Sequence, residues 1–350
     1  MLFLFGAVGY ILGLLSTQVN PKSFWPISYF GLAFPAFLLI ILLFFFYWLF
    51  TKNKKFFFPL LLLIVGWQNV TSFFSVSPFT SKSPDNALKI MSYNVRNFEL
   101  YHWEENDEKR DEIFDLIREE NPDIVCFQEF YSGQNHTTTA GVAKALDMPY
   151  SYFEVGLTNK KNYSFGIAIF SKYPLTNKAR IKLGTKGNLA QKADVIKGQD
   201  TLSLFNIHLA SVRFSREDYS YIEELKDDAT KAGKRSQTKQ IANKLKDGTI
   251  KRSIQAHSVK ARMEDSPYPV VVCGDFNDTP VSYAYQVLAD NMQDTYQKTG
   301  FGVGHTFNDI LPLFRIDYIL VSPNFKVHNT KVIQKKISDH YPVITEVSLR

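Results

Sequence analysis

Cysteine is scarce in this chain of 350 residues, which contains only two. Cys126 and Cys273 lie inside the apolar runs 124–127 and 270–273. Buried free thiols that pack as small hydrophobic groups explain these positions better than a disulfide does. The chain also lacks the Cys/His spacing of structural zinc sites. The cysteines therefore leave the redox compartment open.

Acidic residues are absent from the first 80 positions, which contain no arginine and only four lysines. The rest of the chain carries 36 basic residues against 34 acidic ones, so the formal net charge of +6 falls to +2 there. Such a balance excludes a strongly basic nucleic-acid-binding domain as the source of the charge, although a local basic patch stays possible.

Three apolar stretches, 1–15, 24–50 and 56–74, occupy this N-terminal part. The second stretch runs for 27 positions without a charged side chain. About 20 apolar residues suffice to cross a bilayer as a helix. The first stretch lacks the basic start of a cleaved signal peptide. The sequence predicts an N-terminal transmembrane anchor, residues 1–74, of about three helices.

The loop between the second and third stretches sets the expected orientation. Lys52, Lys54 and Lys55 cluster there, and lysines favour the cytoplasmic side of a membrane. We therefore expect a multi-pass membrane protein whose C-terminal domain faces the periplasm or the exterior. Residues 75–87 are rich in Ser and Pro and indicate a linker.

A different pattern begins at residue 88. Alternating and apolar runs predict strands at 88–95, 123–130, 164–171, 201–209, 269–274, 316–321 and 343–349. Residues 107–120 have helical spacing. Many strands with few helices favour an α/β sandwich, two sheets with helices outside. Residues 215–265 are highly charged and are more typical of a solvated helical excursion than of a nucleic-acid clamp.

Polar side chains stand at the ends of these strands. Taken singly, each is explained as a turn former or a hydrogen-bonded surface residue. Turn chemistry alone does not select carboxylates, amides and imidazoles together at successive strand ends. The set is Asn94, Glu129, His208, Asp275, Asn277, Asp317, Asp339 and His340.

This set matches one chemistry better than its rivals. Carboxylate and amide oxygens suit Mg²⁺ or Mn²⁺, and two histidines supply acid–base groups near neutral pH. The combination predicts in-line attack of water on a phosphoester. The chain has neither the Gly-x-Ser-x-Gly elbow of serine hydrolases nor a nucleotide-binding P-loop. A glycosidase would leave the histidines without a role.

The same segments resemble the endonuclease/exonuclease/phosphatase family, in that family's order, over about residues 88–350. The family includes deoxyribonucleases, abasic-site endonucleases, neutral sphingomyelinases and inositol polyphosphate phosphatases. The resemblance implies a four-layered α/β sandwich. Its segments are Met-Ser-Tyr-Asn-Val (91–95), Phe-Gln-Glu (127–129), Asn-Ile-His-Leu (206–209), Cys-Gly-Asp-Phe-Asn (273–277), Arg-Ile-Asp-Tyr-Ile (315–319) and Ser-Asp-His-Tyr-Pro (338–342).

The resemblance implies a Mg²⁺ or Mn²⁺ cofactor held mainly by Glu129, with Asn94 and Asp339 beside it. It implies that His340 is the general base or the group that fixes the scissile phosphate. Asp317 would orient His340. Which residue of the site is the base stays open at this point.

The remaining roles follow from the same resemblance. Asp275 would position or deprotonate the attacking water, and Asn277 would donate to a phosphate oxygen. His208 would stabilise the transition state or protonate the leaving oxygen, which argues against the abasic-site branch. That branch's phosphate-contacting Tyr and Arg have only weak counterparts here, in Tyr163 and Lys161.

The expected function is that of a membrane-anchored, metal-dependent phosphodiesterase. A position beside a bilayer favours a phospholipid substrate. The large share of nucleases in the family favours a nucleic acid instead, so both substrate classes are kept at this point. A catalytically silent binding module of the same fold is the alternative. A purely structural scaffold is less favoured, because crowded carboxylates and imidazoles cost stability.

Overall fold

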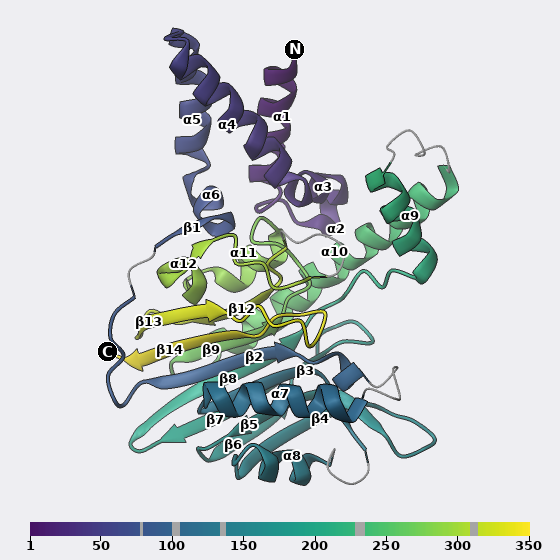
Figure 1. The fold of residues 1–350 in the computed structure, drawn as a ribbon, viewed down its shortest axis with the longest axis vertical. Helices are drawn as coiled ribbons and strands as arrows, with labels where there is room; N and C mark the ends of the chain where they lie inside the picture. The colour runs from purple at the N-terminus through teal and green to yellow at the C-terminus, as the bar shows by residue number, and fades with distance from the viewer. Residues whose placement is uncertain (78–79, 100–105, 134–137, 228–234, 309–313) are drawn as a thin grey trace.

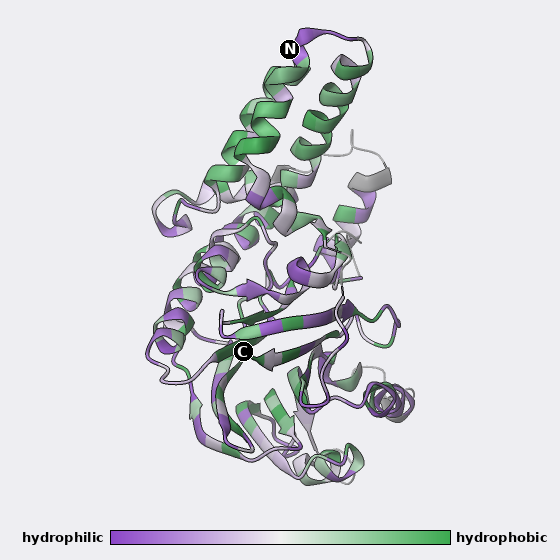
Figure 2. Cartoon of the chain, turned by 90° about the vertical axis from the view of Figure 1, so that its left-hand side faces the viewer, coloured by the Kyte–Doolittle hydropathy of each residue, from purple (hydrophilic) through white to green (hydrophobic). Residues whose placement is uncertain are grey.

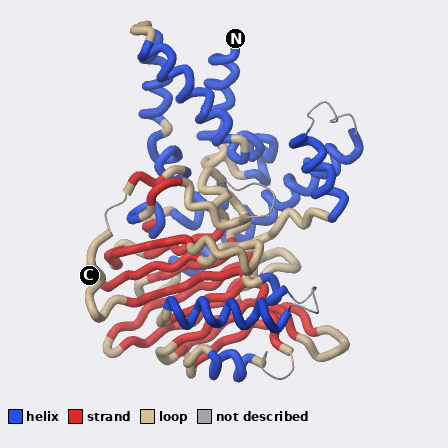
Figure 3. The backbone as a smooth tube through the Cα atoms, in the orientation of Figure 1, coloured by secondary structure: helices blue, strands red, loops and turns tan. Residues whose placement is uncertain are grey.

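The structure, a computed structural model, describes residues 1–350 except 78–79, 100–105, 134–137, 228–234 and 309–313. The body consists of two six-stranded sheets with helices around them, and an N-terminal group of helices projects from one end (Figure 1). Figure 3 separates the strands of the body from the helices outside it.

Both sheets are mixed. The first has the order β13 (Phe325–Val332), β14 (Val343–Leu349), β2 (Leu88–Asn94), β3 (Ile124–Ser132), β5 (Ser164–Ser171) and β4 (Tyr150–Thr158). The second has the order β10 (Gln293–Asp294), β12 (Asp317–Val321), β9 (Val270–Asp275), β8 (Asp200–His208), β7 (Leu189–Lys197) and β6 (Leu175–Arg180). Only the pairs β2–β3 and β8–β9 are parallel among these described strands.

Each parallel pair needs a crossover, because parallel strands cannot be joined by a tight hairpin. Helix α7 (Asn106–Glu120) lies between β2 and β3 in the chain, and α9 (Arg216–Asp227) and α10 (Arg235–Glu264) lie between β8 and β9. The expected helical excursion at residues 215–265 thus coincides with α9 and α10. Shorter helices complete the body, namely α8 (Thr139–Ala145), α11 (Tyr283–Ala289) and α12 (Thr295–Thr299).

Three apolar layers hold the sandwich together. Side chains such as Ile90 and Cys126 meet Leu204 and Cys273 between the two sheets. A second layer joins the first sheet to α7 and α8, and a third joins the second sheet to α10 and α11. Both cysteines are buried free thiols. The prediction of an α/β fold with two mixed sheets flanked by helices is confirmed.

The N-terminal helices form a bundle of their own. They are α1 (Leu2–Leu15), α2 (Pro21–Phe24), α3 (Ser28–Leu32), α4 (Phe34–Phe50), α5 (Phe57–Val65) and α6 (Trp67–Phe73). Small residues let α1 approach α4 closely, since a Cβ on Gly9 would lie 2.2 Å from the Phe37 ring. Figure 2 shows that the helices projecting from the body are mostly hydrophobic.

The expected three spanning helices are not seen as single helices. No one helix in the described residues is both long and apolar enough to cross a bilayer. Two bent pairs reach the required length and composition together, Pro21–Leu32 with Phe34–Phe50 at 50° and Lys54–Val65 with Trp67–Phe73 at 71°.

Residues 75–87, where the sequence suggests a linker, contact the body at several points. Ser75–Val76 forms β1, which pairs with β11 (Phe301–Gly302). The Ser81 backbone N–H donates to the His328 carbonyl at 3.0 Å. The Ser83 hydroxyl donates to the Glu346 carboxylate.

Candidate active site

Three of the expected site residues come together because their strands are neighbours in the second sheet. The parallel register of β8 and β9 places His208 opposite Asp275. The antiparallel register of β12 and β9 places Asp317 opposite the same Asp275. All three side chains therefore gather at one end of this sheet.

Gly274 makes this close approach possible. Its φ is +142°, and a Cβ there would lie 1.9 Å from the Ile207 carbonyl oxygen. No other residue tolerates such a conformation and contact without a backbone shift. After the strand, the Asn277 backbone N–H donates to Asp275 Oδ1 at 2.8 Å and fixes that carboxylate.

The first sheet contributes Asn94 and Glu129 to the same site. Asn94 ends β2 and donates from Nδ2 to Asp275 Oδ2 at 3.0 Å. Glu129 lies at a register shift in β3, between Phe127 and Phe130, and has a φ of +48°. A bulge of this kind redirects a side chain out of the regular alternation. Glu129 Oε1 accordingly lies 3.7 Å from His208 Nε2.

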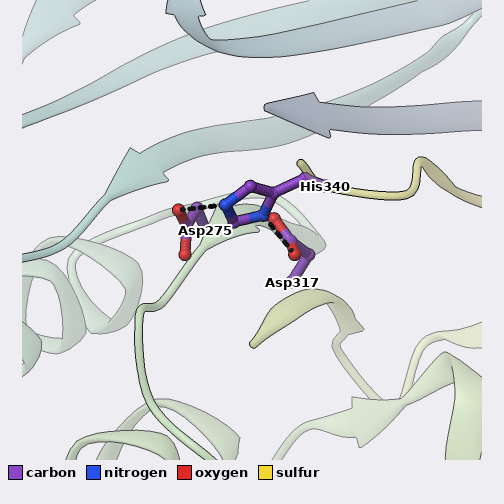
Figure 4. A group of neighbouring side chains, drawn as sticks. All are labelled: Asp275, Asp317 and His340. Carbon is purple, nitrogen blue, oxygen red and sulfur yellow. Dashed lines mark hydrogen bonds and ion pairs between the residues drawn. The ribbon is translucent and has the colours of Figure 1, made fainter. Parts of the chain in front are cut away.

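His340 precedes β14 and lies between two carboxylates (Figure 4). Its Nδ1 is hydrogen-bonded to Asp317 Oδ2 at 2.9 Å. Its Nε2 lies 3.8 Å from Asp275 Oδ2. The Asp317 bond fixes the orientation of the ring and leaves Nε2 facing Asp275, as expected for an oriented acid–base or phosphate-binding histidine.

The two histidines have opposite pKa shifts. Burial lowers the pKa of His208, and the attraction of Asp275 offsets this only in part. Burial would also lower the pKa of His340, but Asp317 and Asp275 outweigh it and raise that pKa well above its usual value. Burial, with repulsion from Asp317, raises the pKa of Asp275 to about 6. These shifts favour the neutral form of His208 and the charged form of His340.

Glu129, Asn94 and Asp339 form the oxygen-rich side of the site. Burial and the nearby Asp339 carboxylate raise the pKa of Glu129, and a hydrogen bond from Asn94 partly offsets this. Asp339 Oδ2 lies 3.4 Å from Arg96 Nε. Glu129 and Asp339 offer two carboxylates for a hard divalent cation, which would relieve their mutual repulsion. The Asn94 Oδ1 atom accepts from the Arg96 backbone N–H at 3.1 Å, so Asn94 would add its amide oxygen only after its side chain turns.

A second set of possible ligands lies beside it. One ligand atom each from Asp275, Asp317 and His340 lies within 4.8 Å of the others, and all three residues are buried. In this set the hydrogen bond to Asp317 already uses His340 Nδ1. The Glu129 side is the better fit to a Mg²⁺-type ion, because its donors are oxygens and Glu129 is 34% exposed.

A cavity of about 500 Å³ opens beside five of the eight expected residues, whereas Asn94, His208 and Asp317 lie behind its lining. Its lining includes Glu129, Asp275, Asn277, Asp339 and His340. Two buried atoms of the site have no hydrogen-bond partner within the described residues, His208 Nε2 and Asp317 Oδ1. Unsatisfied buried polar atoms of this kind are typical of sites that bind a ligand. Asn277 instead donates from Nδ2 to the Leu209 carbonyl at 3.1 Å.

Sequence reasoning missed one cation of the site. Arg213 lines the cavity and lies near enough to His208 to lower its pKa. Its position five residues after His208, on the loop that follows β8, is the signal that identifies it. By contrast, Tyr163 and Lys161, the weak counterparts of phosphate-contacting residues, do not line the cavity.

Comparison with known families agrees with this geometry. The family model of the endonuclease/exonuclease/phosphatase family matches residues 91–340. This protein belongs to that family. Residues 1–73 match a separate domain of unknown function. A comparison with curated proteins gives no match.

Solved structures share the fold at low sequence identity. An endonuclease/exonuclease/phosphatase family protein of Bacteroides thetaiotaomicron is 19% identical, with a TM-score of 0.56 over 76% of this chain and 98% of that one. The human Nocturnin catalytic domain with bound sulfate is 19% identical, with a TM-score of 0.54 over 75% and 94%. A mannosyl-6-phosphatase of B. thetaiotaomicron is 20% identical, with a TM-score of 0.54 over 75% and 100%.

Proposed function

We propose that this protein is a divalent-metal-dependent phosphodiesterase that hydrolyses its substrate by in-line attack of water. One observation carries the proposal: Glu129, Asp275 and His340, which come from distant parts of the chain, line a single cavity. The family's solved structures include a mannosyl-6-phosphatase, which supports phosphoester chemistry.

Asp275 is the centre of the proposed mechanism. Its Oδ2 accepts from Asn94 and lies 3.8 Å from the Nε2 atoms of both His208 and His340. Asp275 orients the attacking water and accepts its proton as the new P–O bond forms. On the opposite side of phosphorus the P–O bond to the leaving group breaks. The products are a phosphomonoester and an alcohol.

The two histidines stabilise this reaction from either side of Asp275. His340, held by Asp317, fixes a non-bridging phosphate oxygen from Nε2. His208 donates a hydrogen bond to the developing negative charge or to the leaving oxygen, and that oxygen takes up a proton from water to become the alcohol. Asn277 and Arg213 lie at the cavity wall, where an amide and a guanidinium donate to phosphate oxygens.

Glu129, Asn94 and Asp339 would hold the Mg²⁺ or Mn²⁺. A bound cation of this type neutralises phosphate charge and polarises the P–O bonds. Arg96 forms an ion pair with Asp339 and so holds that carboxylate in position. The set therefore combines one carboxylate held by an ion pair, Asp339, with Glu129, which is 34% exposed.

We also propose that the N-terminal helices insert into a bilayer. Support comes from the two bent apolar pairs and from the outward-facing apolar side chains of α4 and α5. Lys52, Lys54 and Lys55 lie between those helices, so the catalytic domain would face the extracytoplasmic side. A reporter fused after residue 85 should be active outside the cytoplasm, and activity confined to the cytoplasm would contradict this orientation.

The alternative of a silent binding module is less well supported, because all eight expected site residues are present and each makes one of the contacts described above. Such a module would bind the metal without hydrolysing any phosphoester.

Hydrolysis of bis(p-nitrophenyl) phosphate by the full chain in detergent tests the proposal. We expect turnover with Mg²⁺ or Mn²⁺, none with chelator, and a loss of at least about 100-fold in Glu129→Ala and His208→Ala. Glu264→Ala and His257→Ala, both at exposed positions, serve as matched controls. Undiminished turnover in both site variants would refute the assignment.

A further inference from the structure

The active-site cavity continues beyond the catalytic groups along an apolar surface. Besides the carboxylates and His340, its lining includes Leu32, Ala33, Ile222, Ile241 and Leu245. These five residues, called the apolar wall below, come from α3 and the residue after it, from α9 and from α10. Each is only partly buried, so the wall offers apolar surface to whatever enters the cavity.

We propose that the apolar wall binds a hydrophobic chain of the substrate, so that the enzyme acts on amphipathic, lipid-type phosphoesters. This inference rests on the proposed function and specifies its substrate. The phosphate group would lie in the cavity against Asp275 and His340, and the attached chain would extend along the wall. Burial of apolar surface then contributes to affinity in proportion to the length of chain that enters.

The charges of the cavity favour such a substrate over a nucleic acid. Polymeric phosphates are bound through rows of Lys and Arg that release counterions. Among the residues that the structure describes, two arginines line this cavity, Arg213 and Arg252. Arg252 Nε is paired with Asp278 Oδ2 at 2.8 Å and its Nη1 donates to the Ala210 carbonyl at 2.9 Å. The side of the cavity away from the catalytic groups is the apolar wall. The phosphate of a second nucleotide would need cationic side chains there, and the five residues of the wall are all apolar.

The apolar wall is also continuous with the N-terminal bundle. The Tyr29 hydroxyl donates to the Ala242 carbonyl of α10 at 2.7 Å, and the Lys246 ammonium lies 5.1 Å from the Trp25 ring centroid. A Cβ on Gly31 would lie 2.5 Å from the Val281 carbonyl oxygen, so α3 packs tightly on the loop after β9. The bundle thus forms part of the substrate cavity and connects it to the most apolar surface of the protein.

A series of alkyl p-nitrophenyl phosphates isolates the effect of the chain. The methyl, butyl and octyl compounds are phosphodiesters with the same p-nitrophenolate leaving group. Each is assayed below its critical micelle concentration with the full-length protein. We expect kcat/KM to rise at least about tenfold from butyl to octyl, mainly through KM, because each buried methylene contributes up to about threefold to fourfold. Calorimetry of octyl phosphate against butyl phosphate, in chelator, measures the same preference without turnover.

Two substitutions in the apolar wall test its location. Ile241→Gln and Leu245→Gln keep residues with good helix propensity on α10 and should remove most of the octyl advantage. Hydrolysis of the methyl ester should stay near the wild-type rate. Ile250→Gln, on the same helix but outside the cavity lining, is the matched control and should keep the octyl preference.

The outcomes separate this inference from the proposed function. Failure of the wild type to hydrolyse any ester of the series with Mg²⁺ or Mn²⁺ would overturn the proposed function, and equal calorimetric affinities for octyl and butyl phosphate would overturn the apolar wall. Turnover without chain-length dependence, or equal losses on methyl and octyl esters in the wall variants, would overturn the apolar wall alone. Faster cleavage of a single-stranded DNA oligonucleotide than of the octyl ester would replace the lipid-type substrate by a nucleic acid.

Discussion

The sandwich and the N-terminal bundle each have an apolar core, which in the bundle includes the fully buried Phe34, but they differ in how many large apolar side chains they expose. In the sandwich, Phe127, Phe205 and Phe276 are fully buried between layers. In the bundle, Phe50 is 78% exposed and glycines occupy the interior. Among described residues, all but five of the exposed large hydrophobic side chains lie within residues 1–76. The bundle therefore exposes far more apolar surface than the sandwich does.

The two regions also differ in where their ionisable side chains lie. The sandwich concentrates carboxylates and imidazoles at one end of its sheets, where they are buried at a cost in stability. The bundle has neither acidic side chains nor histidines. The comparison teaches that the chemistry belongs to the sandwich, whereas the bundle contributes packing and part of the cavity wall. The predictions that follow test this division.

The largest effect is expected at Asp275. Asp275→Asn keeps the shape of the side chain but removes its charge, so hydrolysis should fall by about 1000-fold or more. The free energy of unfolding should not fall by more than about 1 kcal/mol, since burial already disfavours this carboxylate. Activity assays and urea denaturation of the same variant measure both. A strong loss of stability would mean that Asp275 supports the fold.

A large effect on stability is expected where the two regions meet. Arg315 is 2% exposed, pairs with Asp294 Oδ2 at 2.7 Å and donates to the Ser72 carbonyl, at the end of the bundle, at 2.8 Å. Arg315→Gln leaves the buried Asp294 unpaired and should lower the free energy of unfolding by about 3 kcal/mol.

The matched control for Arg315 is an exposed pair. Arg118→Gln removes the pair with Asp115 on α7, where both side chains are more than half exposed. Such pairs contribute at most about 1 kcal/mol. Equal effects of the two substitutions would mean that the bundle and the sandwich are not coupled through Arg315.

Much of the sandwich could be predicted from sequence, because its central strands are apolar runs that end in polar residues. The runs near 88–95, 123–130 and 269–274 correspond to β2, β3 and β9. Edge strands gave weaker signals. The strand β4 is largely exposed, and β6 has five exposed positions out of six, so neither shows the alternation of a half-buried strand.

The residue types of the site could be predicted from the sequence, but the way in which they are brought together could not. The eight polar strand-end residues were identifiable, but the bulge that turns Glu129 into the cavity depends on pairing with β5. Arg213 and the apolar wall come from loops and helices that reach the cavity only through tertiary packing. The contacts of α3 with α10 join residues more than 200 positions apart, which no local pattern encodes.

A moderate effect is expected at the contact between α3 and the loop after β9. Gly31→Val would place atoms against Ser16 Oγ and the Val281 carbonyl, which lie 2.3 Å and 2.5 Å from an added Cβ. Overpacking of this kind costs about 1–3 kcal/mol. We expect faster proteolysis between the bundle and the sandwich, whereas Ala36→Val, at an exposed position of α4, should have no effect. Equal proteolysis of both variants would contradict the tight packing.

The smallest effect concerns the segment that joins the two regions. His328 Nδ1 is hydrogen-bonded to Ser81 Oγ at 2.9 Å and Nε2 to Ser348 Oγ at 2.8 Å. Burial and then Lys326 lower the pKa of His328, and Glu346 partly offsets this. The folded state therefore prefers the neutral ring, so this contribution to stability is complete above the unfolded pKa of about 6.5 and is lost as pH falls through the lower folded pKa.

Denaturation curves between pH 5 and pH 8 measure this contribution. His328→Gln should unfold with a flatter pH dependence below about pH 6.5 than the wild type. The same substitution at the exposed His257 is the control. A parallel loss of stability on acidification in the wild type and in His328→Gln would show that folding does not lower the pKa of His328.

The most direct test of the account is to measure Mn²⁺ binding and phosphodiester hydrolysis on the same full-length samples. Electron paramagnetic resonance reports bound Mn²⁺, and bis(p-nitrophenyl) phosphate reports turnover. We predict that both saturate at the same Mn²⁺ concentration in the wild type and that Glu129→Gln loses both. Hydrolysis that persists in chelator, or Mn²⁺ binding that Glu129→Gln leaves intact, would contradict a metal-dependent site at Glu129.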